Sequence, residues 1–214
     1  MILIGYSGHS FVINGILKSK GIQVTGYCDS VEKRHNPLFL KFHGSETSFE
    51  GLAIIKSHDF FISVGNNYSR RQIYNTLSHL GLFPVNAIHS TSLIDENASI
   101  SSSGVMIGGY VIINAFSKIG VGAICNSNCI IEHECIIGDF VHIAPAAVVC
   151  GNVHIGENSF IGARSVIREG IRIGRNVVVG AGSVVVKDIE DGQRQVGNPA
   201  RQIHFNPGHK SNLC

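Results

Sequence analysis

The sequence lacks several features that would assign it to a particular class of proteins. It has no tryptophan, its net charge is only +2, and no run of basic residues suggests a nucleic-acid partner. No segment approaches the roughly 20 apolar residues of a membrane span, and Met1–Ser10 has no positively charged region like that of a signal peptide. We therefore expect a soluble cytoplasmic protein.

Cysteine pairs with the spacing of a metal or redox motif are also missing, because no two of the six cysteines form a Cys-x-x-Cys pair. Cys125 lies on a position of the repeat described next, and Cys129 and Cys135 each follow such a position by four residues. Small apolar side chains suit those places, so we expect buried thiols. Disulfides are rare in a cytoplasmic setting.

What the sequence does have is an apolar repeat with a period of six residues. The period holds from Ile119 to Val185, and an earlier run from Ile94 to Ile112 is offset from it by one residue at Lys118. Such repeats are typical of a left-handed parallel β-helix, a prism in which three hexapeptides form a coil of about 18 residues. The expected inward residues are Ile94, Ile100, Met106, Ile112, Ile119, Cys125, Ile131, Ile137, Ile143, Val149, Ile155, Ile161, Ile167, Ile173, Val179 and Val185.

Residues 1–85 have a different pattern, which predicts a small parallel, Rossmann-like α/β domain. Strand, glycine turn, helix and strand follow one another over residues 2–29, as in a βαβ unit. A further strand over Asp59–Val64, a helix capped by Ser69 and a last strand over Phe83–Ile88 complete the domain. The prism is expected over residues 86–203, followed by a C-terminal tail over residues 204–214.

Several small or polar residues follow the strands of the expected sheet, where ligands of parallel α/β sheets bind. The glycine turn at Gly5–Gly8 would offer backbone N–H groups to a phosphate, although a tight turn without a ligand requires the same glycines. The candidate ligand-binding residues at this edge are Ser7, Gly8, His9, Asp29, Ser30 and Gly65.

The coil length also places His133 on the prism. His133 lies about one coil below Gly151, which leaves space and a backbone N–H beside the imidazole, and it follows the inward Ile131 by two residues, as a prism corner does. Glu132 and Glu134 flank it. A carboxylate beside an imidazole fixes its tautomer, as a general base requires. A solvated surface cluster is the alternative.

His142 lies about half a coil from His133, on the opposite side of the prism. The two side chains cannot share a site within one chain. If they act together, a neighbouring chain must bring its own His142 to His133, so the spacing favours a site between subunits.

A zinc site is a weaker interpretation of the same region. His133, Cys135, His142 and His154 are possible ligands. Cys135 is expected to point inward, and His142 and His154 are expected on different faces. We therefore expect no metal.

One stretch carries a specific resemblance. Residues 131–145, Ile-Glu-His-Glu-Cys-Ile-Ile-Gly-Asp-Phe-Val-His-Ile-Ala-Pro, resemble the sialic acid O-acetyltransferase (NeuD-like) family and, within it, nucleotide-sugar N-acetyltransferases of the UDP-N-acetylbacillosamine type. The N-terminal Ser7–His9, the run Asp59–Asn67 and the closing Gly197–Arg201 are similar too. The resemblance therefore covers nearly the whole chain.

The resemblance implies a role for each matching residue. His133 would be the catalytic base and Glu134 the residue that supports it, while Ser30 and Tyr6 depart from the residues of the bacillosamine enzymes. The positions that match contacts to acetyl-CoA are His142, Gly151, Ala163 and Ala181. The positions that match the nucleotide-sugar site are Ser7, Gly8, His9, Asp29, Ser30 and Gly65.

The function that the resemblance implies is N-acetylation, by acetyl-CoA, of a UDP-linked amino-deoxy sugar at its 4-amino group, for glycan or polysaccharide biosynthesis. It also implies a homotrimer with active sites between subunits. Three alternatives stay open: O-acetylation of a sialic acid or another nucleotide sugar, a zinc lyase of the γ-carbonic anhydrase type, and a non-catalytic nucleotide-sugar-binding protein.

Overall fold

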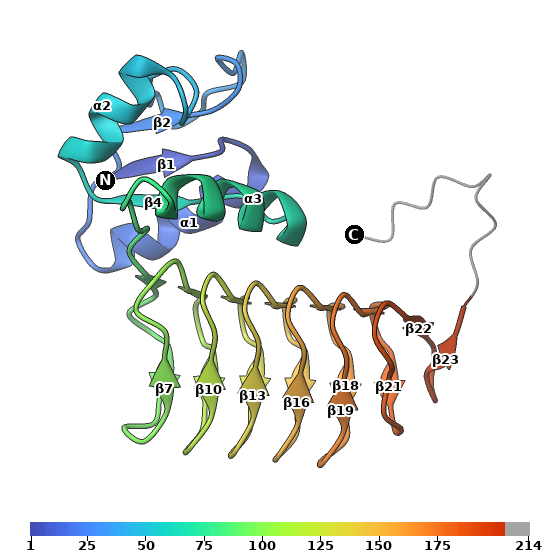
Figure 1. Ribbon diagram of the computed structural model, residues 1–214. Coiled ribbons are helices and arrows are strands. Elements are labelled where there is room, and N and C mark those ends of the chain that lie inside the picture. Colours follow the sequence, from blue (N-terminus) through green and yellow to red (C-terminus); the bar gives the residue numbers. More distant parts are fainter. Residues whose placement is uncertain (204–214) are drawn as a thin grey trace.

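The computed structural model describes residues 1–203 and has two parts, an α/β domain and a prism of stacked coils (Figure 1). The expected tail, residues 204–214, lies outside the described residues. The α/β domain lies over one end of the prism, and helix α3 (Asn67–Ser78) extends above the row of coils. No helix among residues 1–203 is long and apolar enough to cross a membrane.

The α/β domain contains the parallel sheet that the βαβ pattern predicts. Its strand order is β3-β2-β1-β4, and all pairings are parallel. The apolar runs of the sequence form its buried strands, because β1, β2 and β4 are buried along their whole lengths. The elements are β1 (Ile2–Ile4), α1 (Gly8–Ser19), β2 (Gly26–Cys28), β3 (Lys41–Phe42), α2 (Phe49–Ser57), β4 (Phe60–Ile62) and α3.

Three details of this domain differ from the expectation. Helix α2 was not anticipated; the side chain of Ser48 caps it by accepting a hydrogen bond from the Gly51 N–H at 3.1 Å. Helix α3 begins three residues earlier than expected, because Asn66 rather than Ser69 is its N-cap. Within Phe83–Ile88 only β5 (Ala87–Ile88) is a strand, and it pairs with β8 of the prism rather than with the α/β sheet.

The prism has three faces of stacked two- and three-residue strands, as the hexapeptide repeat predicts. The eight-stranded face contains β5, β8 (Met106–Ile107), β11 (Ile124–Cys125), β14 (His142–Ile143), β17 (Phe160–Ile161), β20 (Val178–Val179), β22 (Arg194–Val196) and β23 (Arg201–Gln202). The six-stranded face contains β6 (Leu93–Ile94), β9 (Ile112–Ile113), β12 (Ile130–Ile131), β15 (Val148–Val149), β18 (Val166–Ile167) and β21 (Val184–Val185). The five-stranded face contains β7 (Ser99–Ile100), β10 (Lys118–Ile119), β13 (Ile136–Ile137), β16 (His154–Ile155) and β19 (Arg172–Ile173).

The one-residue offset of the repeat lies earlier than the sequence suggested. Ile88 pairs with Ile107, Ile94 with Ile113 and Ile100 with Ile119, a step of 19 residues. The next step, from Ile107 to Cys125, is 18 residues. The extra residue therefore lies between Ile100 and Ile107, not at Lys118.

The correction changes which side chains fill the prism. Ile107 and Ile113 belong to its core, while Met106 packs outward in the core of the α/β domain and Ile112 points outward on the six-stranded face. Gly104 adopts a φ of 70° within the longer turn, and its N–H donates to the Pro84 carbonyl at 3.1 Å. The longer turn therefore contacts the segment that leads into the prism.

The three outer faces of the prism differ in chemistry. On the eight-stranded face Ala87, Met106 and Ile124 are buried beneath the α/β domain. The five-stranded face presents mainly polar side chains, and the six-stranded face presents apolar side chains that are mostly half-buried. The outward residues of the six-stranded face are Leu93, Ile112, Ile130, Val148, Val166 and Val184. Those of the five-stranded face are Ser99, Lys118, Ile136, His154 and Arg172.

Candidate functional site

His133 and Glu134 form an exposed corner between the six-stranded and five-stranded faces. Their side chains are 59% and 61% exposed, and His133 Nδ1 lies 3.0 Å from Glu134 Oε2. Glu134 adopts a left-handed backbone conformation at this turn, with a φ of 60°. Its N–H donates a hydrogen bond to the Ala115 carbonyl of the coil below at 2.9 Å. One imidazole nitrogen therefore faces a carboxylate, which leaves Nε2 available for a substrate.

The predicted stacking of His133 and Gly151 is observed, and it is close. A Cβ atom on Gly151 would lie 2.6 Å from both Cε1 and Nε2 of His133, so the imidazole itself fills the space that was expected to be open. Glu132 takes no part in the pair, because its Oε2 accepts a hydrogen bond from Asn114 Nδ2 at 2.9 Å. The absence of a side chain at position 151 thus leaves room for the ring in this position.

A pocket of about 830 Å³ lies between the start of α3 and the eight-stranded face, next to the part of that face that the α/β domain covers. Four of the predicted site residues line it: Gly65, His142, Ala163 and Ala181. The other lining residues are Asn66, Asn67, Tyr68, Asn126, Ala144, Pro145, Asn158, Phe160, Gly162, Asn176 and Val178. Apolar and amide side chains thus line one continuous hollow, the composition typical of a small-molecule site.

Unpartnered polar atoms lie in and beside this pocket. His142 is 8% exposed, and its Nδ1 has no hydrogen-bond partner among the described residues, while its Nε2 lies 3.3 Å from Asn126 Nδ2. His9 Nε2 and Asn158 Oδ1 are also buried without a described partner. Because buried polar atoms are normally hydrogen-bonded, these three atoms indicate where a ligand or ordered water would bind.

Burial keeps the two histidines of this region uncharged. The rings of His9 and His142 lie 6.2 Å apart, measured between their centroids. Burial, and next the charge of Arg70, lowers the pKa of His142 to about 3, and the same two causes lower the pKa of His9 to about 4. Both imidazoles are therefore neutral at pH 7, and each can donate one hydrogen bond and accept another.

The remaining predicted binding residues lie at the carboxyl edge of the α/β sheet. Asp29 accepts hydrogen bonds from the Tyr6 N–H at 2.9 Å and the Ser30 N–H at 2.7 Å, and it forms an ion pair with Lys33 at 2.9 Å. Burial alone would raise the pKa of Asp29, but the hydrogen bonds from Lys33, Tyr6 and Ser30 outweigh burial and lower it. Asp29 is therefore ionised, and its hydrogen bond from the Tyr6 N–H stabilises the glycine turn.

The structure thus divides the predicted site residues into three groups. His133, Glu134 and Gly151 share the exposed corner. His9, Gly65, His142, Ala163 and Ala181 gather at the pocket, where a Cβ atom on Gly65 would lie 3.6 Å from the His9 ring. Ser7, Gly8, Asp29 and Ser30 lie at the carboxyl ends of β1 and β2. Gly151, expected near acetyl-CoA together with His142, is thus at the corner and does not line this chain's pocket.

The possible zinc ligands are dispersed. Cys135 is buried, with its Sγ donating to the Cys150 carbonyl at 3.1 Å, while His133 is exposed at the corner. His154 lies on the five-stranded face, 3.3 Å from Arg172. Across residues 1–203, no group of three His, Cys, Asp or Glu side chains could hold a metal ion.

Sequence reasoning did not identify several residues of the pocket region. Arg70 is 2% exposed and lies three residues after Asn67, but no pattern in the surrounding sequence predicts that its side chain is buried. Phe160 pairs with His142 across one coil, so stacking could have indicated it. Asn126 contacts His142 only through its side chain, which the coil register does not predict. Residues that approach from another domain leave no such signal.

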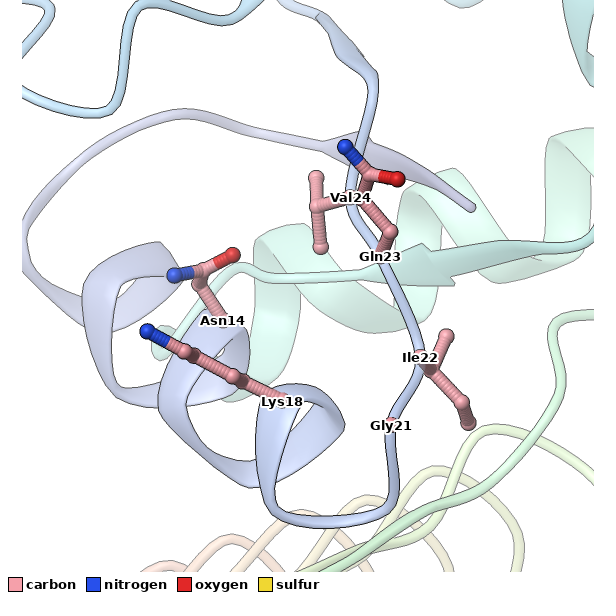
Figure 2. Close-up of a pocket in the computed structure, with 6 residues that line it drawn as sticks. All are labelled: Asn14, Lys18, Gly21, Ile22, Gln23 and Val24. Atoms are coloured by element: carbon pink, nitrogen blue, oxygen red, sulfur yellow. The ribbon is translucent and has the colours of Figure 1, made fainter.

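A second, smaller hollow of about 280 Å³ lies on the α/β domain between α1 and the segment before β2. Asn14 and Lys18 line one side of it and residues 21–24 the other, as Figure 2 shows. None of the predicted site residues lines it, and none of the unpartnered buried atoms belongs to it.

Comparison with known proteins agrees with this arrangement. Residues 1–77 match the PglD N-terminal domain family, and residues 152–187 match the hexapeptide repeat of succinyl-transferase. GDP-perosamine N-acetyltransferase of Escherichia coli O157:H7 is 31% identical over 104 residues, which cover 49% of this chain and 47% of that protein. The match thus spans about half the length of this curated relative.

Two solved structures are similar along nearly their whole lengths. PerB from Caulobacter crescentus, in complex with CoA and GDP-perosamine, is 30% identical with a TM-score of 0.87, over 95% of this chain and 96% of that one. The acetyltransferase domain of PglB from Neisseria gonorrhoeae, in complex with acetyl coenzyme A, is 30% identical with a TM-score of 0.85, over 94% of this chain and 98% of that one.

Proposed function

The chain belongs to the NeuD-like family of nucleotide-amino-sugar N-acetyltransferases, and from this premise we propose that it transfers an acetyl group from acetyl-CoA to the amino group of a nucleotide-linked amino sugar. The observation that carries the proposal is the pocket that Gly65 of the α/β domain and His142 of the prism line together, with the His9 ring beside both of them. Both parts of the molecule contribute to this one pocket, as an enzyme with two substrates requires.

We assign each part of the chain to one substrate. The domain formed by residues 1–85 would bind the nucleotide sugar at the carboxyl edge of its sheet, through Ser7, Gly8, His9, Asp29, Ser30 and Gly65. The prism, residues 86–203, would bind acetyl-CoA against its eight-stranded face, with His142, Ala163 and Ala181 in contact. The neutral imidazole and the amide groups of the pocket suit the amide-rich arm of coenzyme A.

In the proposed reaction the sugar amine attacks the thioester carbon directly. His133 takes the proton of the attacking nitrogen as the tetrahedral intermediate forms, the C–S bond then breaks, and the proton leaves with the CoA thiolate. A positioned general base is worth about 10²–10⁴-fold in rate. The Gly151 N–H beside the imidazole would face the oxyanion, which adds about 10²–10³-fold.

An acyl-enzyme intermediate is not part of this proposal. The thiols nearest to the corner are Cys135 and Cys150, and burial raises the pKa of each above its ordinary value. A thiol with a raised pKa is a poor nucleophile at neutral pH. Direct transfer therefore suits this corner better.

We further propose that the active form is a homotrimer. The His133 corner is exposed in one chain, and it adjoins the six-stranded face with its row of half-buried apolar side chains. Covering that face with a second copy would bury the apolar row and could bring the neighbour's pocket to the His133 corner. Sedimentation should give a trimer, and Val148→Glu on this face should give monomers, whereas His154→Glu on the five-stranded face should not.

The expected acceptor is a 4-amino sugar linked to UDP. The PerB structure holds GDP-perosamine, so the nucleotide must be tested and not assumed. A thiol-release assay with acetyl-CoA should compare UDP-, GDP- and CMP-linked amino sugars with matched sugars that carry a hydroxyl group instead of the amine. Turnover of an amino sugar only is expected, and turnover of the hydroxyl acceptors alone, or of none, would contradict the proposal.

A further inference from the structure

Helix α3 carries a buried cation that the proposed reaction does not use. Arg70 is 2% exposed, and it is the largest of the fully buried side chains among residues 1–203. A buried guanidinium destabilises a fold unless its donors are satisfied. The contacts that compensate for its burial therefore show what it does.

Each N–H group of Arg70 has an acceptor, and the acceptors come from both parts of the molecule. Within the α/β domain, Nη1 donates to the Val64 carbonyl at 3.2 Å and the Gly65 carbonyl at 3.0 Å, and Nη2 donates to Asn67 Oδ1 at 3.0 Å. On the prism, Nε donates to the Gly122 carbonyl at 2.9 Å and Nη2 to the Phe140 carbonyl at 3.0 Å. One side chain thus joins the loop after β4 to two successive coils.

The neighbours of Arg70 reinforce this junction at the pocket wall. Asn67 Nδ2 donates to the Asn158 carbonyl at 3.0 Å and the Ser159 carbonyl at 3.1 Å. Gly65, Asn67 and Asn158 all line the pocket. The network of Arg70 therefore joins the α/β wall of the pocket to the prism wall.

The charge of Arg70 also acts inside the pocket region. Among residues 1–203 no carboxylate forms an ion pair with it, and the nearby ion pair of α3 joins Arg71 to Glu157 at 3.3 Å. Burial lowers the pKa of Arg70 to about 9, which leaves it protonated at neutral pH. After burial, this charge is the next cause of the lowered pKa values of His9 and His142.

We propose that Arg70 is a positioning residue of the active site, because it fixes the Gly65–Asn67 wall to the prism at the distance that both substrates require. The inference rests on the proposed acetyl transfer. Arg70 touches neither substrate in this scheme; it acts through Gly65 and Asn67, and through its charge on the two histidines. Its geometry and its charge can be separated experimentally.

The test compares Arg70→Met, Arg70→Lys and the control Arg71→Met, whose parent side chain is on the same helix but 33% exposed. Lysine keeps the charge but cannot make the five hydrogen bonds of a guanidinium. We expect kcat/KM to fall about 10²-fold in both Arg70 variants, as for a wall displaced by about 1 Å, with the KM values of both substrates raised. Arg71→Met should stay within about twofold of the wild type, the scale of a partly exposed ion pair.

Histidine titration by NMR supplies a readout that does not depend on turnover. The pKa values of His9 and His142 should rise in Arg70→Met and stay low in Arg70→Lys, which retains the charge. Unchanged kcat/KM in both folded variants would overturn the proposal, and so would failure of Arg70→Lys to fold, since Arg70 would then serve stability only. A wild-type protein without turnover would refute the proposed function instead, and the NMR comparison would still test Arg70.

Discussion

The two histidines of the proposed active site lie in opposite environments. His133 is exposed at a prism corner and pairs with a carboxylate, whereas His142 is 8% exposed and uncharged, and its Nδ1 has no hydrogen-bond partner among residues 1–203. The proposed base lies at an exposed corner, and the pocket that would bind acetyl-CoA does not contain it. In the proposed trimer each is half of a site, and a neighbouring chain brings the halves together.

The largest effect should come from removing the base at the corner. His133→Ala should lower kcat by about 10²–10⁴-fold, while the fold and the oligomeric state stay unchanged because the side chain is 59% exposed. Steady-state kinetics and sedimentation measure the two properties. His154→Ala, on the five-stranded face, is the matched control and should keep full activity.

Retained activity in His133→Ala would place the base elsewhere and remove the contrast between corner and pocket. Loss of the oligomer in the same variant would show that the imidazole serves assembly instead of chemistry.

A smaller but still large effect is expected from the glycine that positions His133. In Gly151→Ala the new Cβ would lie 2.6 Å from His133 Cε1 and Nε2, so the imidazole must move. We expect kcat to fall about 10²-fold, in line with a misplacement of about 1 Å. Gly15→Ala in α1 is the control, because a Cβ there meets nothing within 4 Å.

The kinetics of the two glycine variants distinguish positioning from general damage. Gly15→Ala should leave kcat unchanged and stabilise the protein by about 0.5–1 kcal/mol, since alanine favours a helix interior. Equal kcat in Gly151→Ala and the wild type would show that the close contact with His133 has no catalytic role.

The corner and the pocket also differ in how far the sequence predicts them. The stacking of Gly151 on His133 follows from the coil length alone, because neighbours along a prism are set by local hydrogen-bond register. The offset of the repeat was assigned to Lys118 and lies between Ile100 and Ile107, since Met106 is apolar for a different reason: it packs against the α/β domain. Periodicity alone cannot distinguish an inward apolar side chain from an outward one that another domain covers.

The sequence did not predict the pocket either, because the pocket depends on how the two parts of the molecule pack together. Gly65, His142, Ala163 and Ala181 were expected to bind two different substrates, and the docking of α3 brings them to one hollow. Arg70 contacts the prism through carbonyl groups, which any residue provides, so no motif marks its acceptors. Contacts of this kind depend on the relative placement of the two parts, which the pattern within either part does not determine.

The smallest expected effect concerns the pocket and appears as a pH dependence of stability. The folded-state pKa values of His9 and His142, about 4 and about 3, lie below the ordinary 6.5. Below pH 6.5 the unfolded chain therefore binds protons that the native state does not, so the free energy of unfolding falls as the pH drops toward 4. The slope is at most about 1.4 kcal/mol per pH unit for each histidine.

Urea unfolding at several pH values between 7 and 5 measures this slope. The variant His142→Gln isolates the contribution of His142 to it. Carboxylates contribute to the slope in every variant, so the difference between wild type and His142→Gln is the informative quantity. That difference should approach one bound proton per molecule. Equal slopes in wild type and His142→Gln would mean that His142 is solvated and ionises normally, and the contrast between a closed pocket and an open corner would then be lost.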